Sequence, residues 1–200
     1  MKIDWEKWTG MLELGILLLG CAVLLSGVWA SARQRELSDK VVRLHVLAVS
    51  DESRDQEVKQ KVRDAVLERV EPLLADAADA REAQARLASQ LDELRQLAET
   101  VSGERAQVTL SREDYPTRNY RDFSLPAGTY TSLRVVLGEG KGRNWWCVVY
   151  PPLCTAGVEE AAQTAALSRD DVKLISESDT GYQVRFRLLE WWGELLSDFK

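Results

Sequence analysis

The sequence predicts an α+β protein, with an N-terminal signal or anchor helix followed by one two-layer domain of helices packed on a small, mostly antiparallel sheet. Three patterns support this fold class. An uncharged apolar segment runs from Leu14 to Ala30, apolar residues recur at helical spacing between residues 53 and 101, and strand-like alternation begins after Arg105. A chain of 200 residues is long enough for a membrane segment and one domain. We expect residues 1–32 to form a cytoplasmic stub and a signal or transmembrane segment, and residues 33–200 to form one extracytoplasmic signalling domain.

The apolar segment predicts export or membrane anchoring. Its 17 residues are at the lower limit for spanning a bilayer, and they lack the polar face that a soluble core helix would show. Ala30-Ser31-Ala32 matches the small-x-small pattern of a signal-peptide cleavage site. We expect an uncleaved or slowly cleaved anchor; a secreted form and a lipoprotein processed at Cys21 are the alternatives.

The first half of the body predicts one strand and a helical layer. Residues 41–49 alternate between two faces and predict a strand covered on at least one side. A helix follows from residue 53 and ends near Pro72, and leucines at intervals of three and four predict a second helix over 87–101 that Gly103 terminates. Residues 51–101 carry 13 acidic and 8 basic side chains, typical of the solvated face of such a layer.

The second half predicts the rest of the sheet. Strands are expected over 107–110, 130–137 and 144–150, and the glycines of 138–142 predict a hairpin turn between the last two. Toward the C-terminus the patterns predict a helix over 158–167, a strand over 172–175 and a helix over 184–199.

Composition excludes several classes of function. A net charge of −6 without a long basic stretch argues against a nucleic-acid binder, and a single histidine excludes a site built on several histidines. The 138–142 loop does not have the spacing of a phosphate-binding loop, because Lys141 is followed by Gly142 rather than by Ser or Thr. We therefore expect no cofactor, no metal and no small-molecule substrate.

Two cysteines close to each other are compatible with an exported body. Cys147 and Cys154 enclose six residues that include two prolines, and this spacing can close a small disulfide loop in an oxidising compartment. Two reduced, half-buried thiols are the alternative interpretation.

An aromatic and basic cluster begins at the end of the glycine loop. Two adjacent tryptophans alternate along a strand, so at most one should lie in the core, and an exposed aromatic ring beside arginine is typical of protein-recognition surfaces. The alternative is that both faces of this strand are covered. The expected partner-binding residues are Lys141, Arg143, Asn144, Trp145, Trp146 and Tyr150.

Several strings of residues resemble the stage II sporulation protein R family. They follow the family's order across residues 41–154, and the most specific are Arg43-Leu44-His45-Val46, Lys61-Val62-Arg63-Asp64-Ala65-Val66-Leu67, Leu125-Pro126-Ala127-Gly128, Gly138-Glu139-Gly140-Lys141-Gly142-x-Asn144-Trp145-Trp146-Cys147 and Pro151-Pro152-Leu153-Cys154. Residues 155–181 match nothing in that pattern.

The resemblance implies a signalling role in endospore formation. Members of the family are exported from the forespore into the space between its membrane and that of the mother cell, where they activate a membrane-embedded aspartic protease that processes pro-sigma-E. The resemblance therefore implies a protein partner and no enzymatic activity. Two alternatives are an envelope hydrolase that uses Cys147 or His45, and a structural envelope protein without a signalling role.

Overall fold

The computed structural model describes residues 5–120, 123–153 and 167–176. In chain order, the elements are α1 (Trp5–Asp39), β1 (Val42–Leu47), α2 (Ser53–Leu74), α3 (Ala80–Ala88), α4 (Leu91–Ser102), β2 (Ala106–Tyr115), β3 (Arg118–Asn119), β4 (Ser124–Leu125), β5 (Gly128–Leu137), β6 (Asn144–Tyr150) and α6 (Arg169–Ser176). The helices predicted over 158–167 and 184–199 lie outside the described residues, apart from Leu167.

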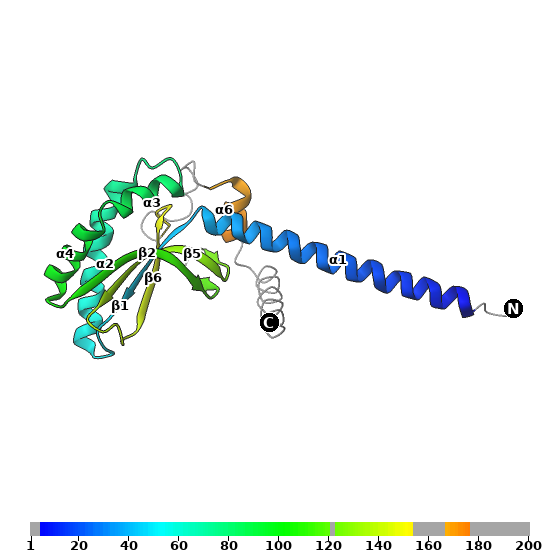
Figure 1. Cartoon of the computed structure of the whole chain (residues 1–200), viewed down its shortest axis with the longest axis horizontal. Coiled ribbons are helices and arrows are strands. Elements are labelled where there is room, and N and C mark those ends of the chain that lie inside the picture. Colours follow the sequence, from blue (N-terminus) through cyan, green and yellow to red (C-terminus); the bar gives the residue numbers. More distant parts are fainter. Residues whose placement is uncertain (1–4, 121–122, 154–166, 177–200) are drawn as a thin grey trace.

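Helix α1 projects away from the body as one long rod (Figure 1). It has 35 residues, and its part from Leu12 to Asp39 is long and apolar enough to cross a membrane. At 1.5 Å per residue α1 is about 50 Å long, which exceeds the roughly 30 Å of hydrocarbon in a bilayer. The helix continues past residue 32, and Leu37, near its end, is fully buried in the body. The apolar segment is therefore joined to the domain by continuous helix rather than by a flexible linker.

The central sheet has the order β2-β5-β1-β6. Strand β1 pairs parallel with β5 and antiparallel with β6, while β2 pairs antiparallel with β5. The predicted α+β class and the mostly antiparallel sheet are therefore confirmed.

Each face of the sheet is covered by its own hydrophobic cluster. The larger cluster joins Leu44 and Val46 of β1 to apolar residues of α2, α3 and α4. The smaller cluster, on the other side, joins the end of α1 to Tyr115, Tyr130 and residues of β4 and α6. Figure 1 shows the three helices on one side of the sheet and α1 with α6 on the other. Both faces of β1 are buried, whereas its sequence predicted that at least one face is covered.

The glycine loop 138–142 is not a hairpin turn, contrary to the prediction. Strand β1 lies between β5 and β6 in the sheet, so the loop must cross two strand spacings, about 10 Å, over the end of β1. Gly138 and Gly140 adopt positive φ angles of 55° and 63°, as the glycines predicted. The Gly142 N–H donates to the Ala48 carbonyl over 2.9 Å, and a Cβ at Gly142 would overlap the Ser50 carbonyl oxygen.

Three elements differ from the sequence prediction, two in their boundaries and one in its type. Pro72 lies inside α2, which ends at Leu74, and the leucine pattern over 87–101 belongs to two helices separated by Ser89 and Gln90. The segment 172–175 is helical within α6 rather than a strand. The reason is a reciprocal cap, because the Ser168 N–H donates to the Asp171 carboxylate and the Asp171 N–H donates to the Ser168 hydroxyl.

We predict that Gly142→Ala destabilises the body by about 2–4 kcal/mol, because the added methyl group overlaps backbone and breaks the hydrogen bond to Ala48. The matched control is Gly103→Ala. Gly103 ends α4 with φ 72°, and the space that a Cβ would occupy there is open, so this change introduces only backbone strain of about 1 kcal/mol. Thermal unfolding of the full chain in detergent measures both. Equal losses would contradict a steric requirement for glycine at residue 142.

Candidate binding site

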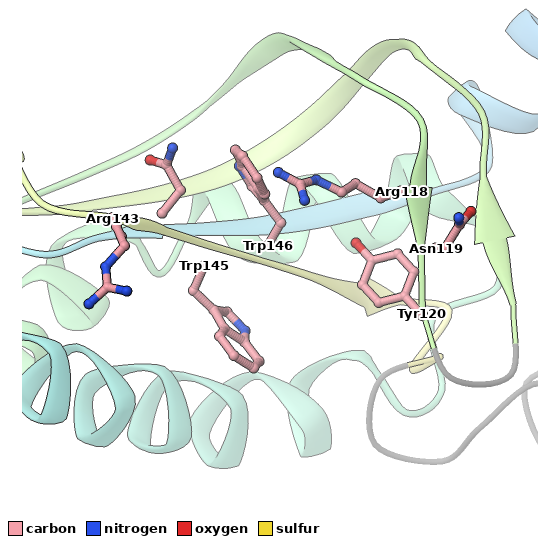
Figure 2. Close-up of a pocket in the computed structure, with 7 residues that line it drawn as sticks. Arg118, Asn119, Tyr120, Arg143, Trp145 and Trp146 are labelled. Atoms are coloured by element: carbon pink, nitrogen blue, oxygen red, sulfur yellow. The ribbon is translucent and has the colours of Figure 1, made fainter. Parts of the chain in front are cut away.

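A pocket of about 470 Å³ opens between β3 and the start of β6 (Figure 2). Its walls are Arg118, Asn119, Tyr120, Arg143, Asn144, Trp145 and Trp146. The sequence cluster predicted the last four of these residues. It did not predict the three contributed by β3 and the residue after it, because a two-residue strand has no periodicity to detect.

The two tryptophans lie on opposite faces of β6. Trp145 packs against the helical cluster, where the guanidinium carbon of Arg63 lies 4.4 Å from its ring centroid. Trp146 packs against the smaller cluster, and its ring centroid lies 5.7 Å from that of His45. Both side chains are half-buried. Neither side chain is therefore fully buried, and both faces of the strand are partly covered.

Arg118 stacks on Trp146 in the pocket. Its guanidinium carbon lies 3.8 Å from the Trp146 ring centroid, which is favourable for a cation–π contact. Its Nε atom is buried and has no hydrogen-bond partner, and no carboxylate of the described residues lies within ion-pair distance of its side chain. Arg118 is thus held in orientation by an aromatic ring while its charge has no counter-ion in the described part of the chain.

A second arginine, Arg43, fixes β3 from beneath. Its side chain is 0% exposed, and its Nη2 donates to the Tyr120 hydroxyl over 2.8 Å. The guanidinium carbon lies 3.9 Å from the Tyr115 ring centroid and 5.0 Å from that of Tyr130, while Nε and Nη1 have no hydrogen-bond partner among the described residues. A buried charge is costly unless it is compensated, so these aromatic faces and the Tyr120 hydroxyl are its compensation within that part of the chain.

A hydrogen-bonded network orients Asn144 at the rim. His45 Nε2 lies 3.0 Å from Asn144 Oδ1, and His45 Nδ1 lies 3.1 Å from Glu113 Oε2. The Tyr115 hydroxyl also donates to Glu113 and lies 2.6 Å from the Ser132 hydroxyl. Burial by itself raises the pKa of Glu113, but the hydrogen bonds from Ser132 and His45 outweigh it, so this pKa is lowered.

The backbone at Arg143 is fixed from two sides. Lys59, only 3% exposed, donates to the Arg143 carbonyl over 3.0 Å, and the Arg143 N–H donates to Asp51 Oδ1 over 2.7 Å. Burial, and then the positive charge of Arg143, lower the pKa of Lys59. The Arg143 side chain is 71% exposed, and its Nε lies 3.5 Å from Asp51. The backbone of Arg143, directly after the glycine loop, is therefore held by two hydrogen bonds, while its side chain is accessible at the pocket.

Two predicted partner-binding residues lie outside this pocket. Lys141 is exposed on the glycine loop and pairs with Glu139. Tyr150 is 2% exposed at the other end of β6, and its hydroxyl donates to the Ala77 carbonyl over 2.9 Å. Cys147 is buried, and Cys154 lies outside the described residues, so the disulfide between them stays a prediction.

The nucleophile and base considered for a hydrolase lie on opposite faces of the sheet. His45 is the register partner of Trp146, and Cys147 is the partner of Leu44. Cys147 therefore points into the helical cluster, whereas His45 contacts Tyr115 and Trp146 on the other face. These two side chains cannot form a catalytic pair. Within residues 5–120, 123–153 and 167–176, no group of three metal-ligating side chains is present.

We predict that Glu113→Gln lowers stability at neutral pH and that the difference from the wild type shrinks in acid. A lowered folded-state pKa stabilises the fold above the usual value of 4.5, and this contribution is lost as the pH falls through the folded-state pKa. Thermal unfolding of the full chain between pH 3 and pH 7 measures it, with the exposed change Glu139→Gln as control. A difference that does not depend on pH would contradict the role given to this network.

Comparison with known proteins identifies the family. Residues 38–160 match the family model described as stage II sporulation protein R, a range that includes β1 to β6 and every residue of the pocket. The chain is 32% identical over 187 residues to stage II sporulation protein R of Bacillus subtilis (strain 168), in a match covering 80% of this chain and 84% of that protein. No solved structure matches the chain. The chain therefore belongs to the stage II sporulation protein R family.

Proposed function

We propose that this protein is an exported sporulation signal that binds and activates a membrane-embedded protease. In this proposal the forespore makes the protein, and its body lies in the space between the forespore and mother-cell membranes. There it engages the mother-cell aspartic protease that processes pro-sigma-E. Membership of the family supports a role in sporulation, and the compartment, the protease and the absence of enzymatic activity are parts of the proposal.

The N-terminal helix supports export. The apolar part of α1 is exposed along its length, as expected for a segment that lies in lipid or serves as a signal sequence. Because α1 continues into the body as helix and buries Leu37 there, an uncleaved anchor would hold the domain close to its membrane. From that position, the domain would contact a partner that is embedded in the facing membrane.

The observation that carries the proposal is the composition of the pocket. Its seven lining side chains comprise two arginines, two asparagines, a tyrosine and two tryptophans, without a carboxylate, thiol or aliphatic hydroxyl among them. Arginine, tyrosine and tryptophan are the residues that most often dominate the binding energy of protein interfaces. This set suits recognition of another protein and offers no general base or activated nucleophile for hydrolysis.

We predict that Trp146→Ala and Arg118→Ala each reduce pro-sigma-E processing by about 30-fold, because truncating an interface hot spot costs about 2 kcal/mol or more. The measurement is cleavage of pro-sigma-E when the full chain, the protease and the substrate are co-expressed. Arg69→Ala is the matched control, since Arg69 lies on α2 and pairs with Glu93 away from the pocket.

Two controls make this result decisive. First, pro-sigma-E processing must depend on the full chain. Second, each variant must be exported, and its unfolding temperature must differ from that of the wild type by no more than the unfolding temperature of the Arg69→Ala variant does. Normal processing with folded Trp146→Ala and Arg118→Ala proteins would remove this pocket from the activation step. Processing that proceeds without the chain would overturn the proposed function itself.

A further inference from the structure

We propose that the pocket recognises a short acidic segment of its protein partner, with one carboxylate on Arg118 and a second carboxylate on Arg143. This inference rests on the proposed function, because it specifies the chemistry of the segment that the signal would bind. It follows from four features of the described residues: an unpaired stacked arginine, an exposed arginine, a buried cation and the absence of acid from the pocket wall.

The first feature is Arg118. Its stack on Trp146 holds the guanidinium plane in place, and no carboxylate of the described residues pairs with it. A guanidinium presents a planar fork of donors that matches the two oxygens of a carboxylate. Because the ring already restricts the side chain, binding such a group would cost less side-chain entropy than it would for a free arginine.

The second feature is the position of Arg143 relative to Arg118. In Figure 2 Arg143 lies on the same side of β6 as Trp145, whereas Arg118 lies with Trp146 on the other side. Arg143 is 71% exposed, and within the described ranges its only ion pair is the 3.5 Å contact with Asp51. Two cations on either side of the edge strand β6 favour a ligand that carries two separated carboxylates in one chain and crosses this edge.

The third feature is the electrostatic background. The Arg43 guanidinium lies directly behind Tyr120, and it has no carboxylate within ion-pair distance among the described residues. Residues 51–101, in contrast, have a net charge of −5. An acidic segment would be attracted to the pocket and repelled by the helical layer, which orients the partner on this face.

The fourth feature is the absence of a carboxylate from the pocket wall that the described residues form. Asn144 is oriented by His45, and the Arg143 backbone is held by Lys59 and Asp51. The nearest carboxylate of the network, Glu113, is committed to His45, Tyr115 and Arg134. The walls therefore present donors in fixed positions, and a ligand has to supply the acceptors.

The test uses the full chain in detergent and three dye-labelled, capped hexapeptides that alternate leucine with glutamate, glutamine or lysine. Fluorescence anisotropy measures binding. We expect the glutamate peptide to bind at least tenfold more tightly than the glutamine peptide, the lysine peptide not to bind, and the affinity to fall with salt. Arg118→Gln and Arg143→Gln should each weaken the glutamate peptide about tenfold or more, because each removes a charged hydrogen bond, while Arg69→Gln leaves the affinity unchanged.

The outcomes separate this inference from the proposed function. Equal binding of the glutamate and glutamine peptides, or unchanged binding by Arg118→Gln and Arg143→Gln proteins that unfold like the wild type, overturns the inference. Tighter binding of a soluble peptidoglycan fragment than of the glutamate peptide also overturns it. If the glutamate peptide binds as expected while pro-sigma-E processing proceeds without the chain, the acidic specificity stands and the proposed function fails.

Discussion

The crossing of the glycine loop over the end of β1 is the constraint on which the rest of the pocket depends. Because β1 is inserted between β5 and β6, the chain must travel over its end within the six residues 138–143. At residue 142 only glycine fits, since a Cβ there would overlap the Ser50 carbonyl oxygen. The crossing fixes where β6 begins, and the first residues of β6 supply one side of the pocket.

The other side of the pocket depends on a buried charge. Arg43 belongs to the same central strand, and its guanidinium holds Tyr120 at the end of β3. One strand, β1, therefore positions both walls: the glycine loop crosses its C-terminal end, and Arg43 near its start holds Tyr120, the residue after β3. The His45 side chain adds a third connection to Asn144. The arrangement couples fold stability to the shape of the binding surface, because a change in β1 alters both walls.

The sequence predicted the fold class well because long periodic segments report burial directly. The helical layer and strands β1, β5 and β6 show a regular spacing of apolar residues, and the apolar helix is a long continuous apolar segment. It failed where pairing is non-local: glycines between two strands resemble a hairpin turn, and nothing local indicates that β1 intervenes. The same limit applies to the site. Arg143 to Trp146 are adjacent in the sequence, whereas Arg118 reaches them only through tertiary structure. Tyr150 is likewise buried by the larger cluster, which the local sequence does not indicate.

Site-specific photo-crosslinking tests the central claim that this pocket is the surface that contacts the protease. A photoreactive residue replaces Asn119, which is exposed at the pocket wall, and in a parallel sample it replaces Arg81 at the start of α3. Both samples are irradiated during active pro-sigma-E processing. We expect a crosslink from residue 119 to an extracytoplasmic acidic segment of the protease, and none from residue 81. A crosslink from residue 81 alone, in processing-competent protein, would contradict it.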